Sequence, residues 1–444
     1  MKIKLKNIGV LSNAEIDLSK DLIILCGPNN SGKTYAAYTV YGLYRYMQEL
    51  VSSDIIYYWI DIIKKKPTTN TIDLLEFYKI FEASIHTALK NDFSIFLKNV
   101  FATNNFYFEK SEVTFEKELY ENEIMAFEFI YESGNEKAVK KNGTLTAFIG
   151  KEVTDNNSSY FTIEKGNLLN SVKKFLINQL FGSVYITTAE RSAINIFSKE
   201  LSIKRNTIVD QLLDLRDSQK KGAENLLNKL QRYPLPIRDS LEIAEDLANL
   251  QKNKSEYGFL ADRIEQVLLD GKIKISAEGE VQYSPNKSKA KNLSIHLTAS
   301  IVKSLSNLVF YFRHLAKKGD FIIIDEPELN LHPDNQRKIA RLLGEIIGQG
   351  FKVMISTHSD YIIREINNLV MLQSGGEKSI PLMEKYGYEA QQLIKPEQIG
   401  AYLFKGNRNY TLPVTETGFE VATIDEEINL LNNASEEIFF TLFD

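Results

Sequence analysis

Cysteine, tryptophan and long apolar runs are scarce in this chain of 444 residues. The single cysteine, Cys26, excludes an internal disulfide and suits a reducing cytosol. No run of about 18 apolar residues occurs, so no membrane span is expected. The first residues alternate lysine with apolar side chains and lack a signal-peptide core, which favours a cytoplasmic protein. A net charge of −5 gives no overall attraction to nucleic acid or to an anionic membrane.

What is present is typical of a soluble globular protein. Hydrophobic residues make up 43% of the chain and charged residues 25%. At about 150 residues per domain, the length allows two or three structural units.

The motif GPNNSGKT at residues 27–34 is the strongest local signal in the chain. An apolar strand is predicted at 22–26 and a helix at 34–47, which is the setting of a phosphate-binding P-loop. Its glycines let backbone N–H groups point at phosphate oxygens, and the helix N-terminus favours negative charge. We expect Lys33 to reach the terminal phosphates and the Thr34 hydroxyl to bind Mg²⁺. The residues expected to hold the nucleotide are Gly27, Pro28, Asn29, Asn30, Ser31, Gly32, Lys33 and Thr34.

Two adjacent carboxylates supply a second part of the expected site. They follow the apolar run 321–324, whose composition indicates a strand buried on both faces of a parallel sheet. Ligands bind at the carboxyl ends of such strands. Asp325 is therefore expected to hold Mg²⁺, directly or through water, and Glu326 to orient or activate the attacking water.

A histidine completes this constellation. The sequence predicts a helix at 335–347 and a further buried strand at 352–356, and His358 lies just beyond that strand. A histidine at this place can bond the γ-phosphate or the attacking water.

The remaining segments have mixed patterns. Residues 48–97 are predicted to be helical, and 106–165 to form an antiparallel meander of four or five strands. Residues 199–270 are predicted to form at least two helices, because Pro234 and Pro236 interrupt the pattern.

Two basic features allow more than one interpretation. Arg191, in the segment TAERS after a short strand at 184–187, could face a nucleotide or an adjacent subunit, or could form a plain surface ion pair. The lysine-rich loop 284–292 could be solvated or could contact a phosphate backbone.

The segments GPNNSGKT, IIIDEPELNLHP and MISTHSDYII resemble the ABC-type ATPases of the SMC, RecF and OLD group. Within that group they are similar to bacterial AAA family ATPases of phage-defence and abortive-infection operons. The resemblance covers about 1–47 and 290–375, and TAERS and YPLPIRDSLE also look like this group.

This resemblance implies that two ATPase heads sandwich ATP. The P-loop of one head faces a signature helix of the other, and the matching segment here is LTASIVKSL at 297–305. Ser300 would then lie at the γ-phosphate held by the partner. Ile301 stands where the family usually has glycine, which departs from the pattern for close backbone approach. Asn330, His332 and Asp334 would lie in the loop that crosses the dimer interface.

The implied fold class is α/β: an ABC-type P-loop ATPase head, a mixed sheet with flanking helices, with helical and antiparallel β insertions between Walker A and Walker B. The expected division assigns 1–50, 184–198 and 271–375 to the head, 51–183 to a helical and β-meander insertion, 199–270 to a helical insertion, and 376–444 to strands and a helix that complete the head.

The resulting functional hypothesis is an ATP-hydrolysing switch. It would form a homodimer or higher oligomer through its heads and control an effector protein encoded nearby, in antiviral defence. A RecF-like or SMC-like DNA-binding repair ATPase and a nucleotide-gated scaffold with little hydrolysis, suggested by Ile301, remain alternatives. The large insertions disfavour a transporter subunit. The acidic cluster at 416–427 lacks a DxD spacing, which favours a solvated face over a nuclease site.

Overall fold

The computed structural model describes residues 1–52, 71–73, 85–103, 107–116, 130–133, 136–141, 144–149, 181–198, 200, 232–286 and 292–443. Within these ranges every helix is too short or too polar to span a bilayer. The predictions for loop residues 287–291 and for much of 48–97 and 199–270 concern residues outside these ranges.

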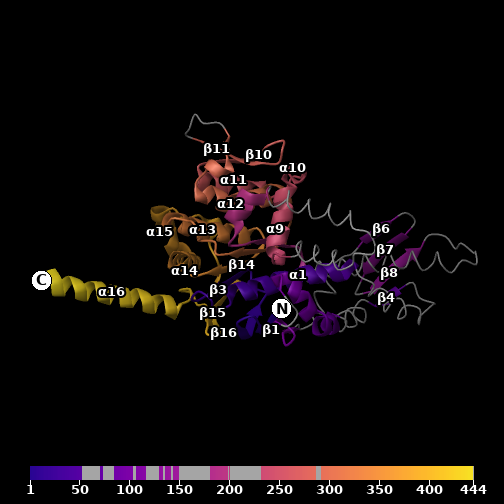
Figure 1. The fold of residues 1–444 in the computed structure, drawn as a ribbon, viewed down its shortest axis with the longest axis horizontal. Helices are drawn as coiled ribbons and strands as arrows, with labels where there is room; N and C mark the ends of the chain where they lie inside the picture. The colour runs from indigo at the N-terminus through magenta and orange to yellow at the C-terminus, as the bar shows by residue number, and fades with distance from the viewer. Residues whose placement is uncertain are drawn as a thin grey trace, which may run out of the picture.

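A mixed sheet of nine strands forms the centre of the molecule (Figure 1). Its order is β5-β1-β2-β16-β15-β3-β14-β13-β9. The strands are β1 (Lys2–Ile8), β2 (Leu11–Asp17), β3 (Leu22–Cys26), β5 (Glu112–Glu116), β9 (Val184–Thr187), β13 (Phe321–Asp325), β14 (Lys352–Thr357), β15 (Ile399–Lys405) and β16 (Arg408–Leu412). The five strands from β15 to β9 are parallel, which brings the carboxyl ends of β3, β13 and β14 to one edge.

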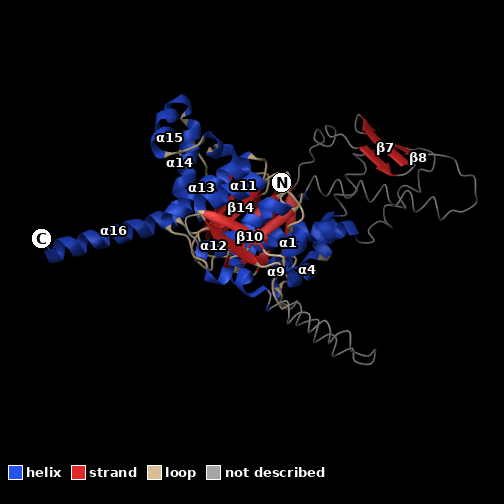
Figure 2. Cartoon of the chain, turned by 90° about the horizontal axis from the view of Figure 1, so that it is seen from above, coloured by secondary structure: helices blue, strands red, loops and turns tan. Residues whose placement is uncertain are grey.

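Helices cover both faces of this sheet because its central strands are apolar on both sides (Figure 2). Ile23 and Leu25 of β3 pack into one core, whereas Leu22 and Ile24 pack into the other. The first core includes α1 (Lys33–Ser52), α4 (Phe93–Phe101) and Leu235 of α9 (Leu235–Glu245). The second includes α11 (Gly258–Ile264), α12 (Ser300–Phe310), α13 (Pro333–Gly348) and α14 (Asp360–Ser374). Cys26 is buried in the second core, and burial raises the pKa of its thiol to about 12.

Two smaller antiparallel sheets form outside the central sheet, one from 271–294, within the expected head, and one from residues of the expected insertion 51–183. One has the order β10-β11-β12 and the other β4-β8-β7-β6. Their strands are β4 (Thr71–Asp73), β6 (Ile130–Ser133), β7 (Glu136–Lys141), β8 (Thr144–Ile149), β10 (Gly271–Ile275), β11 (Val281–Pro285) and β12 (Leu293–Ser294). The predicted meander is confirmed for β6, β7 and β8. β5 instead pairs with β1 in the central sheet, although the sequence placed it within the insertion 51–183.

The segment after α14 returns to the central sheet. β15 lies beside β3, between it and β16, so strands from the two ends of the chain are neighbours. The shorter helical elements are α10 (Leu247–Leu250), η2 (Glu265–Leu269), η3 (Ile295–Leu297), η4 (Tyr311–Leu315), η5 (Gly376–Ser379), α15 (Ile380–Tyr386), η6 (Ala390–Gln392) and η7 (Pro396–Gln398). The last helix, α16 (Ala422–Phe443), extends away from the body of the molecule in both views (Figures 1 and 2).

Candidate nucleotide-binding site

The P-loop connects β3 to α1, as the sequence predicts. Gly27 has a φ of +134° and Gly32 a φ of +97°, which L side chains rarely adopt. A Cβ on Gly27 would also collide with the carbonyl oxygen of Phe404 in β15, and one on Gly32 with the Leu11 side chain. Glycine is therefore required at both positions for the loop to pass close to the sheet.

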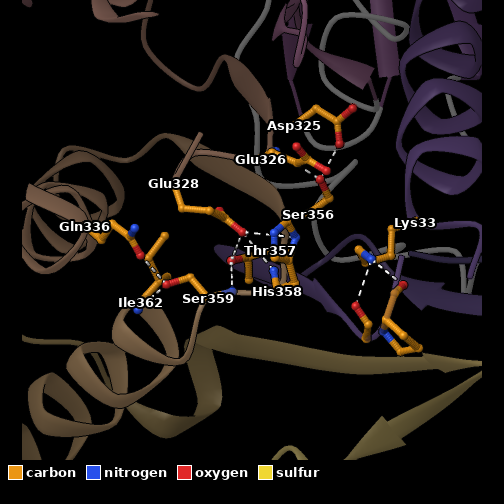
Figure 3. Close-up of polar contacts among 12 residues, drawn as sticks. Lys33, Asp325, Glu326, Glu328, Gln336, Ser356, Thr357, His358, Ser359 and Ile362 are labelled. Atoms are coloured by element: carbon orange, nitrogen blue, oxygen red, sulfur yellow. Dashed lines mark hydrogen bonds and ion pairs between the residues drawn. The ribbon is translucent and has the colours of Figure 1, made fainter. Parts of the chain in front are cut away.

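Lys33 is buried at the start of α1. Its Nζ donates hydrogen bonds of 2.8 Å to the carbonyl oxygens of Gly27 and Pro28 (Figure 3). Burial lowers the pKa of this ammonium, and the carboxylates of Glu326 and Asp325 oppose that shift. The side chain thus folds back onto its own loop. Its positively charged ammonium lies where the sequence predicts that phosphate binds.

Thr34 and Asp325 bring the two halves of the site together. Thr34 Oγ1 lies 3.4 Å and 3.3 Å from the two carboxylate oxygens of Asp325. Ser356, opposite Asp325 in the register of β13 and β14, donates its hydroxyl to the same carboxylate. Burial raises the pKa of Asp325 to about 6, although this hydrogen bond acts in the opposite direction.

Glu326 leaves the strand with an unusual backbone. Its φ is +50°, in the left-handed region that glutamate rarely adopts. Its backbone N–H donates to the carbonyl oxygen of Ser356 at 3.0 Å and to the Ser356 hydroxyl at 3.1 Å. The turn places Asp325 and Glu326 next to one another near Ser356 at this edge of the sheet (Figure 3).

Arg191 holds this turn from the other side. Its guanidinium donates to the carbonyl oxygens of Thr188, Asp325 and Glu326 at 3.2, 2.8 and 2.7 Å. The side chain is only 2% exposed, so the surface ion pair considered from the sequence is wrong. Two of these three carbonyls belong to the residues that carry the carboxylate pair.

His358 follows β14 and is linked to a carboxylate that the sequence analysis did not single out. The backbone N–H of His358 and the hydroxyl of Thr357 each donate to Glu328 Oε1 at 2.8 Å (Figure 3). His358 Nδ1 lies 3.5 Å from the same oxygen. Glu328 is buried, and the third carboxylate in the segment DEPE was the signal that could have identified it.

The residues expected to cross a dimer interface form the turn into α13. Asn330 has a φ of +64°, and Nδ1 of His332 accepts a hydrogen bond of 3.3 Å from the backbone of Asp334. His332 is thus the N-cap of α13. In the first turn of α13, Gln336 accepts a hydrogen bond of 2.6 Å from Ser359, the N-cap of α14.

Ser300 is separate from this group within one chain. It is the exposed first residue of α12, and no hydrogen bond to residues 27–34 is found for it within the described ranges. The neighbouring Ile301 is half-buried and packs against the second core. The side chain at the position of the expected glycine therefore points in part to the interior.

The site fits a magnesium ion that takes few protein ligands. Mg²⁺ prefers oxygen donors and keeps several waters when it binds with phosphates. The Thr34 hydroxyl and the Asp325 carboxylate are such donors, and they already face one another. In the described part of the chain no cluster of three or more His, Cys, Asp or Glu forms a separate metal site.

A P-loop beside a strand that ends in Asp-Glu, within a mixed sheet flanked by helices, defines an ABC-type P-loop ATPase head. The model of the AAA ATPase domain family matches residues 1–363. The chain therefore belongs to the AAA ATPase domain family.

More distant similarities agree with this class. The chain is 33% identical over 91 residues to the energy-coupling factor transporter ATP-binding protein EcfA of Carboxydothermus hydrogenoformans, covering 18% of this chain and 34% of that protein. It is 36% identical over 63 residues to EcfA of Methanothermobacter thermautotrophicus, covering 14% and 20%. The chain thus spans about a third or less of these relatives.

Similar solved structures include SMC head domains. One is the Smc head domain of Pyrococcus furiosus bound to the C-terminal domain of ScpA, with a TM-score of 0.33, 10% identity and 98% of each chain covered. Another is the SMC head domain from Thermotoga maritima, with a TM-score of 0.29, 11% identity and 93% and 98% covered.

Proposed function

We propose that this protein is a switch that binds and hydrolyses ATP and dimerises through its nucleotide sites. The observation that carries the proposal is the contact between Thr34 and Asp325, which lie 291 positions apart in the chain. Both oxygens are of the kind that Mg²⁺ prefers, and the fold brings them together beside the P-loop.

Each residue has a definite role in this proposal. Lys33 leaves the carbonyls of Gly27 and Pro28 to pair with the terminal phosphates of ATP. Mg²⁺, held by Thr34 and Asp325, would neutralise charge on the β- and γ-phosphates. Glu326 orients the attacking water and accepts its proton. His358 donates a hydrogen bond to the γ-phosphate or the water, and Glu328 positions it through the backbone.

The proposed dimer supplies the part of the site that one chain lacks. Ser300 of a second copy would contact the γ-phosphate, and 330–334 would lie between the two copies. Support comes from the exposed position of Ser300 at the start of a helix, an end that favours negative charge. The proposed domain division has a head, two insertions and a C-terminal segment. The head comprises 1–50, 184–198 and 271–375, the insertions are 51–183 and 199–270, and the last segment is 376–444.

We further propose that the switch controls an effector protein encoded nearby, in cytoplasmic antiviral defence. Support comes from the resemblance of the three motifs to ATPases of phage-defence operons. Co-purification with the product of the adjoining reading frame, with and without ATP, tests this part. An effector that binds equally in both conditions would contradict control by the switch.

Glu326→Gln provides the direct test of the switch. The variant should bind ATP like the wild type, lose turnover by at least about a hundredfold, and accumulate as a dimer in sedimentation velocity. Glu416→Gln, at an exposed carboxylate far along the chain, is the control and should behave as wild type. A Glu326→Gln chain that stays monomeric in saturating ATP would refute the dimer.

A DNA-binding repair ATPase predicts a different result. A gel shift with duplex DNA across a salt series would show tight binding that weakens steeply with salt. Such binding by the isolated chain would replace effector control with DNA binding as the output of the switch.

A further inference from the structure

We infer that residues 429–443 of α16 are a docking helix for a partner protein that presents an apolar groove with a basic rim. This inference rests on the proposed function, because the partner would be the protein that the switch controls.

The base of α16 is attached to the head and the rest is not. Ile424 packs against the second core, and Asp425 Oδ1 lies 4.0 Å from Arg364 of α14. From 429 to 443 every residue is exposed, and both views show the helix leaving the body (Figures 1 and 2). The head therefore anchors the first turns and presents the remainder.

The exposed part continues α16 for fifteen residues, about 22 Å, beyond its anchored turns. Helices in proteins gain most of their stability by packing an apolar face. An occupant for that face would therefore stabilise residues 429–443.

Large apolar residues gather mainly on one side of the exposed part, with Ser435 among them, and Leu430 and Phe440 add apolar surface on other sides at 62% and 58% exposed. Leu431, Ile438 and Leu442 recur at the spacing of one helix side and are 68%, 57% and 68% exposed. Phe439 and Phe443 widen the same side, at 57% and 76% exposed. Large exposed apolar patches of this kind mark interaction sites.

The acidic side chains of α16 favour a partner with a basic surface. The ionised side chains between 422 and 443 are all acidic, with no lysine, arginine or histidine among them: Asp425, Glu426, Glu427, Glu436 and Glu437. Within 429–443, Glu436 borders the apolar side and Glu437 lies away from it, whereas Asp425 and Glu427 belong to the first turns next to the head. A second copy would bring like charges together, and anionic lipid would repel the helix. A groove rimmed by lysine or arginine complements both the face and its borders.

The test uses the full chain and a synthetic probe. The probe is a 21-residue helical peptide with leucine at the a and d positions and lysine at e and g, and its match carries glutamate in place of lysine. Fluorescence anisotropy should show that the chain binds the lysine peptide, more weakly as salt rises, and does not bind the glutamate peptide. Leu431→Gln/Ile438→Gln/Leu442→Gln should weaken binding by at least about tenfold.

Asn429→Gln/Asn433→Gln/Thr441→Gln is the matched control, because it introduces three glutamines on the other side of the helix. It should bind the peptide like the wild type. Equal binding by both triple variants, or no binding by the wild type, would overturn the inference. So would self-association without ATP that the apolar triple variant abolishes, or α16-dependent binding to zwitterionic vesicles.

The ATP-dependent measurements separate this inference from the function on which it rests. Both triple variants should hydrolyse ATP and dimerise as the wild type does. Normal turnover with no α16-dependent peptide binding would overturn the docking helix alone. Peptide binding without turnover would overturn the switch instead.

Discussion

Arg191 Nη2 donates a hydrogen bond of 2.7 Å to the carbonyl oxygen of Glu326, and Nη1 donates one of 2.8 Å to that of Asp325. One buried guanidinium therefore holds the backbone of both carboxylates that the proposed chemistry requires. Since Glu326 has a φ of +50°, the turn needs such support to keep an unfavourable conformation. We propose that Arg191 positions this turn through these backbone hydrogen bonds.

Arg191→Gln tests this positioning role. Three carbonyl oxygens would lose a charged donor, so the free energy of unfolding should fall by about 3 kcal/mol or more in urea titrations. Turnover should fall at least about tenfold with little change in KM, because the variant disturbs Glu326 more than the P-loop. Arg408→Gln, at an exposed arginine, is the control. A variant that loses stability but keeps full kcat would contradict a role for Arg191 in positioning.

Lys33→Ala should weaken ATP binding about a hundredfold, since a charged hydrogen bond to phosphate contributes about 1.5–3 kcal/mol. Titration with a fluorescent ATP analogue measures the affinity. Lys405→Ala removes an exposed lysine at the end of β15 and should leave the affinity unchanged. Unchanged affinity in Lys33→Ala would mean that phosphate binds elsewhere.

The raised pKa of Asp325 should make the stability of the protein depend on pH in the absence of Mg²⁺. Its pKa is about 6 in the folded chain against 3.8 ordinarily, so the folded state holds more protons between these values. The contribution of this group to the free energy of unfolding is therefore largest below pH 4, and it is lost as the pH rises through 6. Asp325→Asn removes the buried charge. Above pH 6 its free energy of unfolding should exceed that of the wild type by up to about 3 kcal/mol, and it should unfold at a higher temperature.

Thermal unfolding in EDTA from pH 4 to 8 measures this difference, which should disappear below pH 4. ATP with Mg²⁺ should then stabilise the wild type more than the variant, because asparagine lacks the carboxylate that is proposed to hold the metal together with Thr34. A difference that does not change with pH would show that charge burial is not its cause.

Ser300→Ala addresses the proposed contribution of the second copy. Nucleotide affinity of the monomer should be unchanged, whereas ATP-dependent dimerisation should weaken about tenfold through loss of a hydrogen bond to a charged phosphate. Sedimentation velocity in the Glu326→Gln background measures this. Ser435→Ala, at an exposed serine of α16, is the control. Full dimerisation without the Ser300 hydroxyl would argue against a contact with the γ-phosphate.

Local patterns in the sequence determined the elements that carry the chemistry. The residues 22–34 and 321–326 each combine a strand with its functional residues, and the strand before His358 has the same form, so their spacing along the chain was enough. The helices at 34–47 and 335–347 were predicted within a few residues of α1 and α13 for the same reason: apolar periodicity is a property of neighbouring residues.

Tertiary structure alone decided the surroundings of those elements. The sequence does not show that β15 lies against β3 and that Phe404 thereby makes Gly27 obligatory, or that Arg191 bonds to backbone carbonyls 134 and 135 positions away. Glu328 was likewise missed, because its link to the site consists of hydrogen bonds from Thr357 and His358, which are distant in the sequence. Contacts of this kind depend on which strands become neighbours in the sheet, and that order follows from packing over the whole chain rather than from any local pattern.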